Sequence, residues 1–379
     1  MDHIPFSGIR DIFEECSRLE REGEDIVHLE IGRPDFDTPD PIKSAAKQAL
    51  DDGHVHYTSN YGVLPLRERL SQKFHDENDV RYDPESEIIV TAGATEAIFL
   101  TLLAFVDPGE EVLIPDPCWT YEPGIRAAGG VPRRYPLDPT NGFRPDVAAM
   151  RAAVTDDTAL VVVNSPHNPT GSAISEADLR ALKEVVLEHD LLLLSDEIYE
   201  KIVYGETAHR TPASDDELYE RTITVNGFSK AYSMTGWRLG YLGAPANLID
   251  PIIRVRQYSS TCAPSVSQYA GIRALEGDLH QPLVETFTNR RKTILDRIED
   301  IPGMEMPEPA GAFYAFPTIP GESDDKAFVR DLLREAGVAT VPGTVFGPSG
   351  AGRLRIAYSN SRERIDTGFD RLEQWLETR

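Results

Sequence analysis

The chain alternates short apolar runs with longer amphipathic segments between about residues 45 and 275, and this alternation restricts the fold more than any other feature. The apolar runs are residues 87–93 (EIIVTAG), 111–116 (EVLIPD), 159–166 (ALVVVNSP), 191–197 (LLLLSDE) and 222–229 (TITVNGFS). Between and after these runs, other segments carry apolar residues three or four positions apart, for example 95–105, 175–189 and 247–260. Continuous apolar strands separated by helices predict a mostly parallel sheet covered on both faces, which is a three-layer α/β domain.

The pattern changes after about residue 276. A long charged segment at 283–300 precedes a second helical pattern at 325–337, short apolar runs and a closing helix. This mixture predicts a smaller α+β domain that the start of the chain also joins. The expected division is 1–44 with the small domain, 45–275 as the large domain and 276–379 as the small domain.

Charge excludes two classes of partner. The chain has 63 Asp plus Glu against 38 Lys plus Arg, a formal net charge of −25. Such a surface repels nucleic-acid phosphates and anionic membranes, so neither is an expected partner. The acids are dispersed along the chain, which suggests a halophilic, acidic-proteome origin; a comparison of the thermal midpoint in dilute buffer and in molar KCl tests this hypothesis.

The cysteines and the start of the chain indicate a reducing compartment. The three cysteines, Cys16, Cys118 and Cys262, have neither metal-type nor redox-type spacing, so no disulfide framework and no metal site is expected. The start lacks an apolar segment of signal-peptide length, and the longest aliphatic runs are too short to span a bilayer. A cytoplasmic protein is expected.

Polar residues follow the predicted strands, at the edge where open α/β sheets bind ligands. Asn168, Asp196, Tyr199 and Lys230 come after three of the apolar runs, and a Gly-Ala-Thr turn at 93–95 opens a predicted helix. Each has an ordinary explanation when taken singly, since Asp196 could cap a helix and Lys230 could be a solvated lysine. The order of all of them together is more informative.

The motifs SPHNPTG (165–171), DEIY (196–199), NGFSKAYSMTGWRLG (226–240) and RLRIAYS (353–359) occur in the order found in one family. The chain resembles the class I/II aminotransferases of the pyridoxal phosphate-dependent fold type I group. The segments at 30–40, 57–70, 91–98 and 309–316 are also similar, so the resemblance covers nearly the whole chain.

The resemblance implies a role for each residue around the reactive part of pyridoxal 5′-phosphate. Lys230 would form the Schiff base with the cofactor and then move the substrate proton, which needs an amine that is partly neutral. Asp196 would face the pyridine nitrogen and keep it protonated. Tyr199 and Asn168 would hydrogen-bond the phenolic oxygen.

The rest of the cofactor would be held by a second group of residues. The amides of Ala94 and Thr95 at a helix N-terminus and the guanidinium of Arg238 would bind the phosphate. Trp119 would stack on the ring, although a core tryptophan is the alternative. Tyr57 would reach the phosphate bound by a neighbouring subunit, which implies a homodimer with shared active sites.

The resemblance also assigns the substrate contacts. Arg355 would clamp the α-carboxylate of the amino acid with its planar fork, helped by Gly32 and Asn168. Arg353 would point the same way if the segment is a strand, but Arg355 matches the family pattern better. Asp116–Pro117 and Asn168–Pro169 are the expected cis peptide bonds.

Two positions depart from the family pattern. Many relatives carry a phosphate-binding hydroxyl three residues before the lysine, where this chain has Gly227. Either one hydrogen bond to the phosphate is missing, or Ser229 and Tyr57 substitute for it. His167 would be a solvent-facing turn residue or a pH-sensitive neighbour of Asn168.

The leading interpretation is an aminotransferase with ping-pong kinetics and 2-oxoglutarate as acceptor. A β-lyase of the cystathionine type is the alternative on the same fold, because the fate of the substrate carbanion depends on its leaving group. A cofactor-binding DNA regulator is the third interpretation, and it is not expected because the charge is wrong for DNA and no basic helix-turn-helix segment is found before residue 30; filter binding with DNA at low salt checks it. The sequence leaves the donor amino acid open, since Arg33 and Arg126 cannot be placed over a site.

Overall fold

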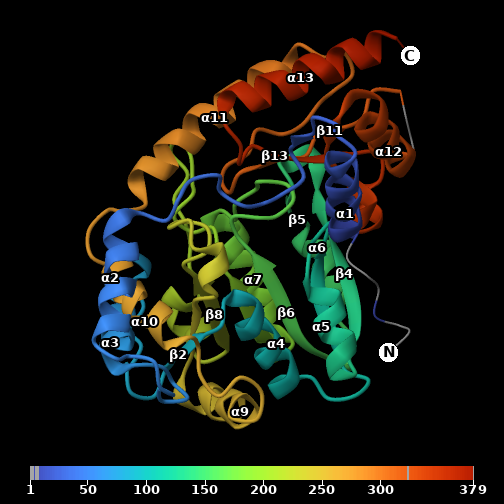
Figure 1. Ribbon diagram of the computed structural model, residues 1–379. Coiled ribbons are helices and arrows are strands. Elements are labelled where there is room, and N and C mark those ends of the chain that lie inside the picture. The colour runs from blue at the N-terminus through green and yellow to red at the C-terminus, as the bar shows by residue number, and fades with distance from the viewer. Residues whose placement is uncertain (1–3, 5–7, 322–323, 379) are drawn as a thin grey trace.

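An eight-stranded sheet forms the centre of the molecule (Figure 1). The computed structural model describes residue 4, residues 8–321 and residues 324–378. The strands lie in the order β2 (Ile88–Thr91), β9 (Gly240–Gly243), β8 (Thr222–Gly227), β7 (Leu192–Asp196), β6 (Thr158–Asn164), β3 (Glu111–Asp116), β4 (Val131–Asp138) and β5 (Arg144–Pro145). From β8 to β4 all neighbours are parallel. The strand β9 is antiparallel to both β2 and β8, and β5 is antiparallel to β4.

All five predicted strands are present, and the expectation of a mostly parallel, covered sheet is confirmed. Sequence patterning missed the other three strands, β4, β5 and β9. The first four residues of β4 are exposed or half-buried, including two arginines, so the strand does not read as an apolar run. The strand β9 is only GYLG, and glycine is a poor strand former.

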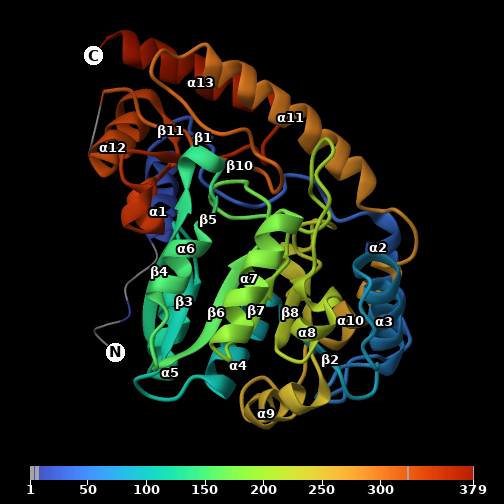
Figure 2. The same cartoon turned by 180° about the vertical axis from the view of Figure 1, so that it is seen from behind.

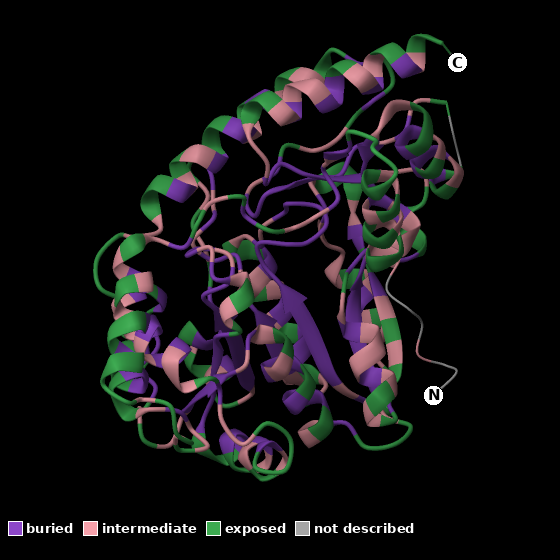
Figure 3. Cartoon of the chain, in the orientation of Figure 1, coloured by how far each residue is buried: buried purple, intermediate pink, exposed green. Residues whose placement is uncertain are grey.

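Helices cover both faces of this sheet, as opposite views show (Figures 1 and 2). Val112 and Ile114 of β3 pack into the core shared with α4 (Ala94–Phe105), α5 (Tyr121–Ala128) and α9 (Ala246–Arg256). Leu113, between them, packs into the core shared with α6 (Val147–Ala153), α7 (Glu176–Glu188) and α8 (Asp216–Tyr219). Buried residues therefore run through the whole depth of the sheet (Figure 3), as a three-layer α/β architecture requires.

Three further helices pack beside the β2 edge of the sheet. They are α2 (Asp40–Asp51), α3 (Leu64–Asn78) and α10 (Ser265–Ala274), and α10 contacts both of the others. Leu66, Leu70 and Phe74 of α3 share a core with Ile88 and Val90 of β2. This packing holds the loop between α2 and α3, which contains Tyr57, at the surface.

Segments from the two halves of the sequence that are far apart in the chain pack together. The strand β1 (Val27–His28) pairs in parallel with β11 (Val338–Ala339), next to α1 (Gly8–Arg21) and α12 (Asp325–Ala336). A separate three-stranded sheet contains β10 (Tyr314–Ala315), β13 (Leu354–Ala357) and β12 (Val341–Pro342), and α11 (Gln281–Glu299) packs along α13 (Arg362–Glu377). Short 3₁₀ turns occur at Pro139–Asn141, Pro212–Ser214, Thr235–Trp237, Gly343–Phe346 and Pro348–Gly350.

None of the helices that the structure describes combines the length and the apolar character needed to cross a bilayer.

Candidate active site

A cavity of about 270 Å³ opens at the carboxyl ends of the central strands and brings most of the predicted residues together. Its lining includes ten of them: Gly32, Ala94, Thr95, Trp119, Asn168, Asp196, Tyr199, Lys230, Arg238 and Arg355. A larger hollow of about 670 Å³ lies between α11, α12 and α13, but its polar lining is acidic and contains none of these residues. The smaller cavity is therefore the candidate active site.

Lys230 follows β8 and lies within the cavity. Its Nζ donates a hydrogen bond to the Gly32 carbonyl oxygen at 2.6 Å. Burial, reinforced by the guanidinium of Arg355, lowers the pKa of the Lys230 amine to about 8, although Asp196 acts in the opposite direction. A neutral amine is therefore accessible near neutral pH, as a proton-transfer group requires.

Asp196 ends β7 and is buried at the floor of the cavity. Its Oδ2 accepts a hydrogen bond from the Tyr121 hydroxyl at 2.6 Å, and its Oδ1 accepts one from the Ile198 amide at 3.3 Å. Burial raises the pKa of the Asp196 carboxyl to about 6. Among the described residues no cation forms an ion pair with this carboxylate, so a cationic ligand group would stabilise it.

Tyr121 is a site residue that no sequence motif indicated. It lies on α5, 75 residues before Asp196, and its hydroxyl lowers the pKa of that carboxyl. The Tyr121→Phe variant is expected to leave Asp196 protonated up to a higher pH, because the charged form loses a hydrogen bond. Titrations of the cofactor between pH 5.5 and 8 should place the acid-side loss of affinity at higher pH than in the wild type. An unchanged profile would show that Tyr121 does not tune Asp196.

Two asparagines after β6 connect the floor of the cavity to its substrate side. The Asn164 side chain donates to the backbone oxygen of Asp196 at 2.9 Å and accepts from the Asn168 amide at 3.0 Å. Asn164 therefore fixes the loop that presents Asn168, and it was not predicted. The expected cis bonds Asp116–Pro117 and Asn168–Pro169 are confirmed, and Ser165–Pro166 is also cis.

Arg355 is a buried guanidinium in β13. It donates to the Asn168 Oδ1 at 3.2 Å and to the backbone oxygen of Glu30, and it packs over the Tyr314 ring at 4.8 Å. No carboxylate among the described residues pairs with it, and its Nε has no hydrogen-bond partner there. An uncompensated buried cation of this kind is suited to an incoming carboxylate.

Arg353 does not join this site. It lies outside β13, stacks over the Phe143 ring at 5.0 Å and donates to the Phe316 carbonyl oxygen at 3.2 Å. Of the two arginines, Arg355, which the family pattern favours as the carboxylate clamp, lines the cavity, and Arg353 does not. Neither Arg126, which pairs with Glu122, nor the exposed Arg33 lines the cavity.

Two tyrosines close the wall of the cavity beside Gly32. The hydroxyls of Tyr199 and Tyr314 lie 2.7 Å apart, and both residues are buried. A Cβ at position 32 would collide with the Tyr314 hydroxyl, so glycine is required for this approach. Tyr314 lies in the 309–316 segment that resembles the family, but no role was predicted for it.

The opposite end of the cavity is suited to an anion. Gly93 is the N-cap of α4 with φ +86°, and a Cβ there would collide with the Arg238 guanidinium. Since Gly93 offers no capping side chain, the first amides of the helix, at Ala94 and Thr95, remain available to a ligand. Arg238 is anchored by donating to the backbone oxygens of Thr235 at 3.1 Å and Ala92 at 3.3 Å.

The two departures from the family pattern have structural explanations. A Cβ at Gly227 would lie 3.1 Å from both Gly240 Cα and the Leu239 oxygen, so close backbone packing excludes a serine without movement of β8 or β9. The expectation that His167 faces solvent or responds to pH is wrong. It is buried beside Thr170, with Nδ1 2.8 Å from that hydroxyl, and burial lowers the pKa of its imidazole to about 3.

Of the two aromatic residues predicted to contact the cofactor, one lines the cavity and the other does not. Trp119 lines it and keeps 40% of its surface exposed. Tyr57 is 87% exposed and is absent from the lining of its own subunit's cavity. A role for Tyr57 at a bound phosphate therefore requires a second subunit.

The side chains and backbone amides that line the cavity are chemically suited to bind pyridoxal 5′-phosphate. The unpaired carboxylate of Asp196 suits a protonated ring nitrogen, and the Lys230 amine with its lowered pKa suits the aldehyde. Arg238 and the first turn of α4 suit the phosphate.

Comparisons with known proteins agree with this chemistry. The family model for aminotransferase class I and II matches residues 24–372. An aspartate aminotransferase of Pyrococcus abyssi is 41% identical over 99% of this chain and 97% of its own. An aromatic-amino-acid aminotransferase of Thermococcus litoralis is 40% identical over 98% of this chain and 95% of its own. The solved structure of an alanine aminotransferase from Pyrococcus furiosus superimposes with a TM-score of 0.94 at 33% identity and covers 100% of this chain and 98% of its own.

Proposed function

The chain belongs to the class I and II aminotransferases, which are pyridoxal phosphate-dependent enzymes, and on that premise we propose that it transfers the amino group of an L-amino acid to 2-oxoglutarate. One observation carries the proposal: Lys230, Asp196 and Arg355 line a single cavity. Donor and acceptor would use this cavity in turn, so ping-pong kinetics are expected.

Each cavity residue has a task in this reaction. When bound, the cofactor supplies an aldehyde that joins the Lys230 amine and a ring that withdraws electrons from the substrate Cα. Asp196 holds the proton on the ring nitrogen, and Tyr121 keeps the carboxylate charged while it does so. Tyr199 and Asn168 are proposed to donate to the phenolic oxygen.

Arg355 and Lys230 act on the substrate itself. The fork of Arg355 binds the α-carboxylate, with Asn168 and the amide of Gly32 beside it, and so fixes the direction of the Cα–H bond. Lys230 Nζ would take up the Cα proton of the substrate and hold it for return later in the reaction. Its lowered pKa allows both directions of transfer near neutral pH.

A half-reaction screen tests this proposal and identifies the donor. Each L-amino acid is added to the purified holoenzyme, and the loss of absorbance of the aldehyde form of the cofactor is followed. The expected result is a loss of that absorbance with release of the matching 2-oxo acid, followed by recovery of the absorbance with formation of glutamate when 2-oxoglutarate is added. Pyruvate and ammonia released from cystathionine, without any need for a 2-oxo acid, would instead establish the β-lyase alternative.

We also propose a homodimer in which Tyr57 of one subunit reaches the phosphate held by the other. Two observations support this proposal. Tyr57 is exposed, so a second subunit can contact it. Among the described residues, the cations that line the cavity are Lys230, Arg238 and Arg355; each already has a role, so a further group at the phosphate would have to come from outside this lining. The Tyr57→Phe variant is expected to bind the cofactor about tenfold more weakly, since it loses one hydrogen bond to a charged group. Equilibrium titration of the cofactor measures this change.

Mixed dimers test the sharing directly. A hybrid of a Lys230→Ala subunit with a Tyr57→Ala subunit contains one site with both residues intact, so activity at limiting cofactor should rise above that of either parent. A Lys230→Ala and Arg355→Gln hybrid is the control, because both residues line one subunit's cavity and every site lacks one of them. If native mass spectrometry shows subunit exchange and the first hybrid gains no activity, Tyr57 does not act across an interface.

A further inference from the structure

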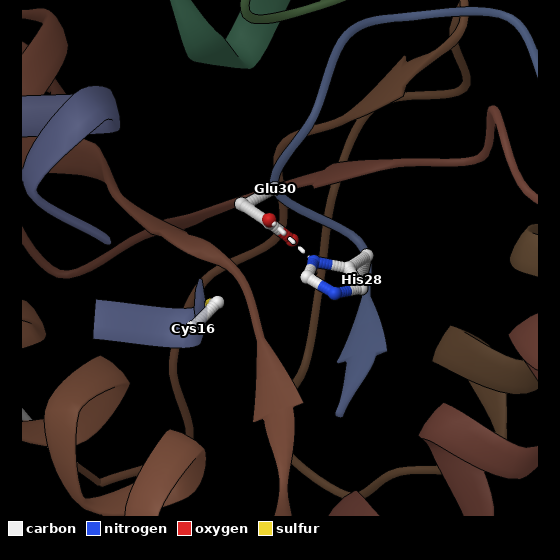
Figure 4. A group of neighbouring side chains, drawn as sticks. All are labelled: Cys16, His28 and Glu30. Carbon is white, nitrogen blue, oxygen red and sulfur yellow. Dashed lines mark hydrogen bonds and ion pairs between the residues drawn. The ribbon is translucent and has the colours of Figure 1, made fainter. Parts of the chain in front are cut away.

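Three side chains outside the active-site cavity form a cluster of metal-type ligands (Figure 4). Cys16 comes from α1, His28 ends β1, and Glu30 follows two residues later. Alternate residues of an extended segment share a face, which turns His28 and Glu30 to the same side, towards Cys16. The thiol, imidazole and carboxylate ligand atoms all lie within 4.8 Å of one another.

The carboxylate of Glu30 indicates that this cluster takes a ligand. Glu30 is 0% exposed, and its Oε1 lies 2.7 Å from the His28 Nδ1. Its Oε2 is buried and has no hydrogen-bond partner among the described residues. A buried carboxylate oxygen left without a partner is costly, so a cation that contacted Oε2, in addition to the imidazole that already pairs with Oε1, would remove this cost.

We propose that Cys16 Sγ, His28 Nδ1 and a carboxylate oxygen of Glu30 bind a divalent transition-metal ion of the Zn²⁺ type, with water as the fourth ligand. Thiolate, imidazole and carboxylate together suit zinc, whereas calcium and magnesium require mainly oxygen ligands. Tetrahedral zinc separates its ligand atoms by roughly 3.3–3.7 Å. The three side chains therefore need only small rotations to reach this geometry.

The surroundings of His28 match the way proteins orient a metal-binding imidazole. Its Nε2 lies 3.0 Å from the Glu20 Oε1, so that nitrogen can donate its proton to the carboxylate while Nδ1 faces Cys16 and Glu30. A carboxylate behind the ligating histidine fixes the ring and makes it a better ligand. Cys16 is 0% exposed and packs against Leu333, which keeps solvent oxidants away from the thiol.

The position of the cluster gives the ion a structural task. The bound ion would join α1 to the segment that enters the active site. In that segment the Glu30 carbonyl oxygen accepts a hydrogen bond from Arg355, and the Gly32 carbonyl oxygen accepts one from Lys230. The same helix contributes Ile9 to the lining of the cavity. Metal binding should therefore raise the thermal midpoint of the holoenzyme.

Cobalt is the probe for the experiment, because Co²⁺ bound to a thiolate gives a charge-transfer absorption band that other ligands do not give. Chelator-treated holoenzyme is titrated with Co²⁺ and then with Zn²⁺. The expected result is a thiolate band that saturates at one Co²⁺ per subunit, disappears on addition of Zn²⁺ and is accompanied by a higher thermal midpoint. The Cys16→Ser variant should lose the band completely.

Matched variants make the outcome decisive. Cys262→Ser removes a half-buried thiol far from the cluster in sequence and should keep the band. Glu30→Gln preserves the shape of the side chain, and it should keep the band but weaken Co²⁺ binding at least tenfold. Circular dichroism and cofactor content verify that each variant is folded. No thiolate band in the wild type, or a band that survives in folded Cys16→Ser, would overturn the proposal.

Discussion

Replacement of Lys230 with alanine is expected to lower the turnover number for transamination by about four orders of magnitude, the largest effect of any single substitution in this chain. The variant loses both the amine that joins the cofactor and the base that moves the substrate proton. Its cofactor should still bind, because Arg238, the first turn of α4 and Asp196 are untouched. Single-turnover kinetics with a good donor measure the proton-transfer step directly.

Two controls accompany this experiment. Lys47→Ala removes an exposed lysine on α2 and should leave turnover unchanged. Borohydride reduction followed by peptide mapping should place the reduced cofactor on Lys230 in the wild type and on no peptide of the Lys230→Ala variant. Wild-type turnover in Lys230→Ala, or an adduct on another lysine, would remove the basis of the proposed mechanism.

Replacement of Arg355 with lysine is expected to lower kcat/KM by about a hundredfold, equivalent to about 3 kcal/mol of transition-state stabilisation. Lysine keeps the positive charge but loses the planar fork that binds both oxygens of a carboxylate. The position is buried against Tyr314 and Asn168, so a flexible ammonium cannot reproduce the geometry. Steady-state kinetics over a range of donor concentrations give the change.

Arg353→Lys is the matched control, two residues away. Because Arg353 stacks on Phe143 and lies outside the cavity lining, its kcat/KM should stay within about twofold of the wild-type value. A further measurement uses a 2-oxo acid that competes with the donor: only the Arg355 variant should bind it more weakly. Equal losses in the two variants would mean that Arg355 has no special contact with the substrate carboxylate.

The sequence predicted those helices and strands whose burial is visible in the pattern of their own apolar residues. The strands from β2 to β8 that are buried on both faces appear as apolar runs, and the helices that cover them show three-to-four spacing. The strand β4 was not predicted because its first four residues are exposed or half-buried and include two adjacent arginines, so they do not form an apolar run. The strand β9 escaped because close contact between Gly240 and the start of α4 demands glycine, which carries no strand signal.

The cavity residues divide in the same way. Lys230, Asp196 and Arg355 could be placed because each lies within a motif of recognisable order. Tyr121 could not be placed, because its role depends on a hydrogen bond from its hydroxyl to the Asp196 carboxylate, which lies 75 residues further along the chain. The prediction for His167 was wrong for a related reason: a turn sequence usually lies at the surface, but this turn is buried.

The pairing of β1 with β11 has a consequence for how the protein folds. Val27 pairs with Val338, which lies 311 positions further along the sequence, so β1 has no strand partner until the chain has closed a loop of that length. Contacts this distant are slow to close, and the unpaired segment exposes an edge that other molecules can extend. Until β1 pairs, this segment is an open strand edge, and chaperones that bind exposed strands are expected to protect it from aggregation during folding.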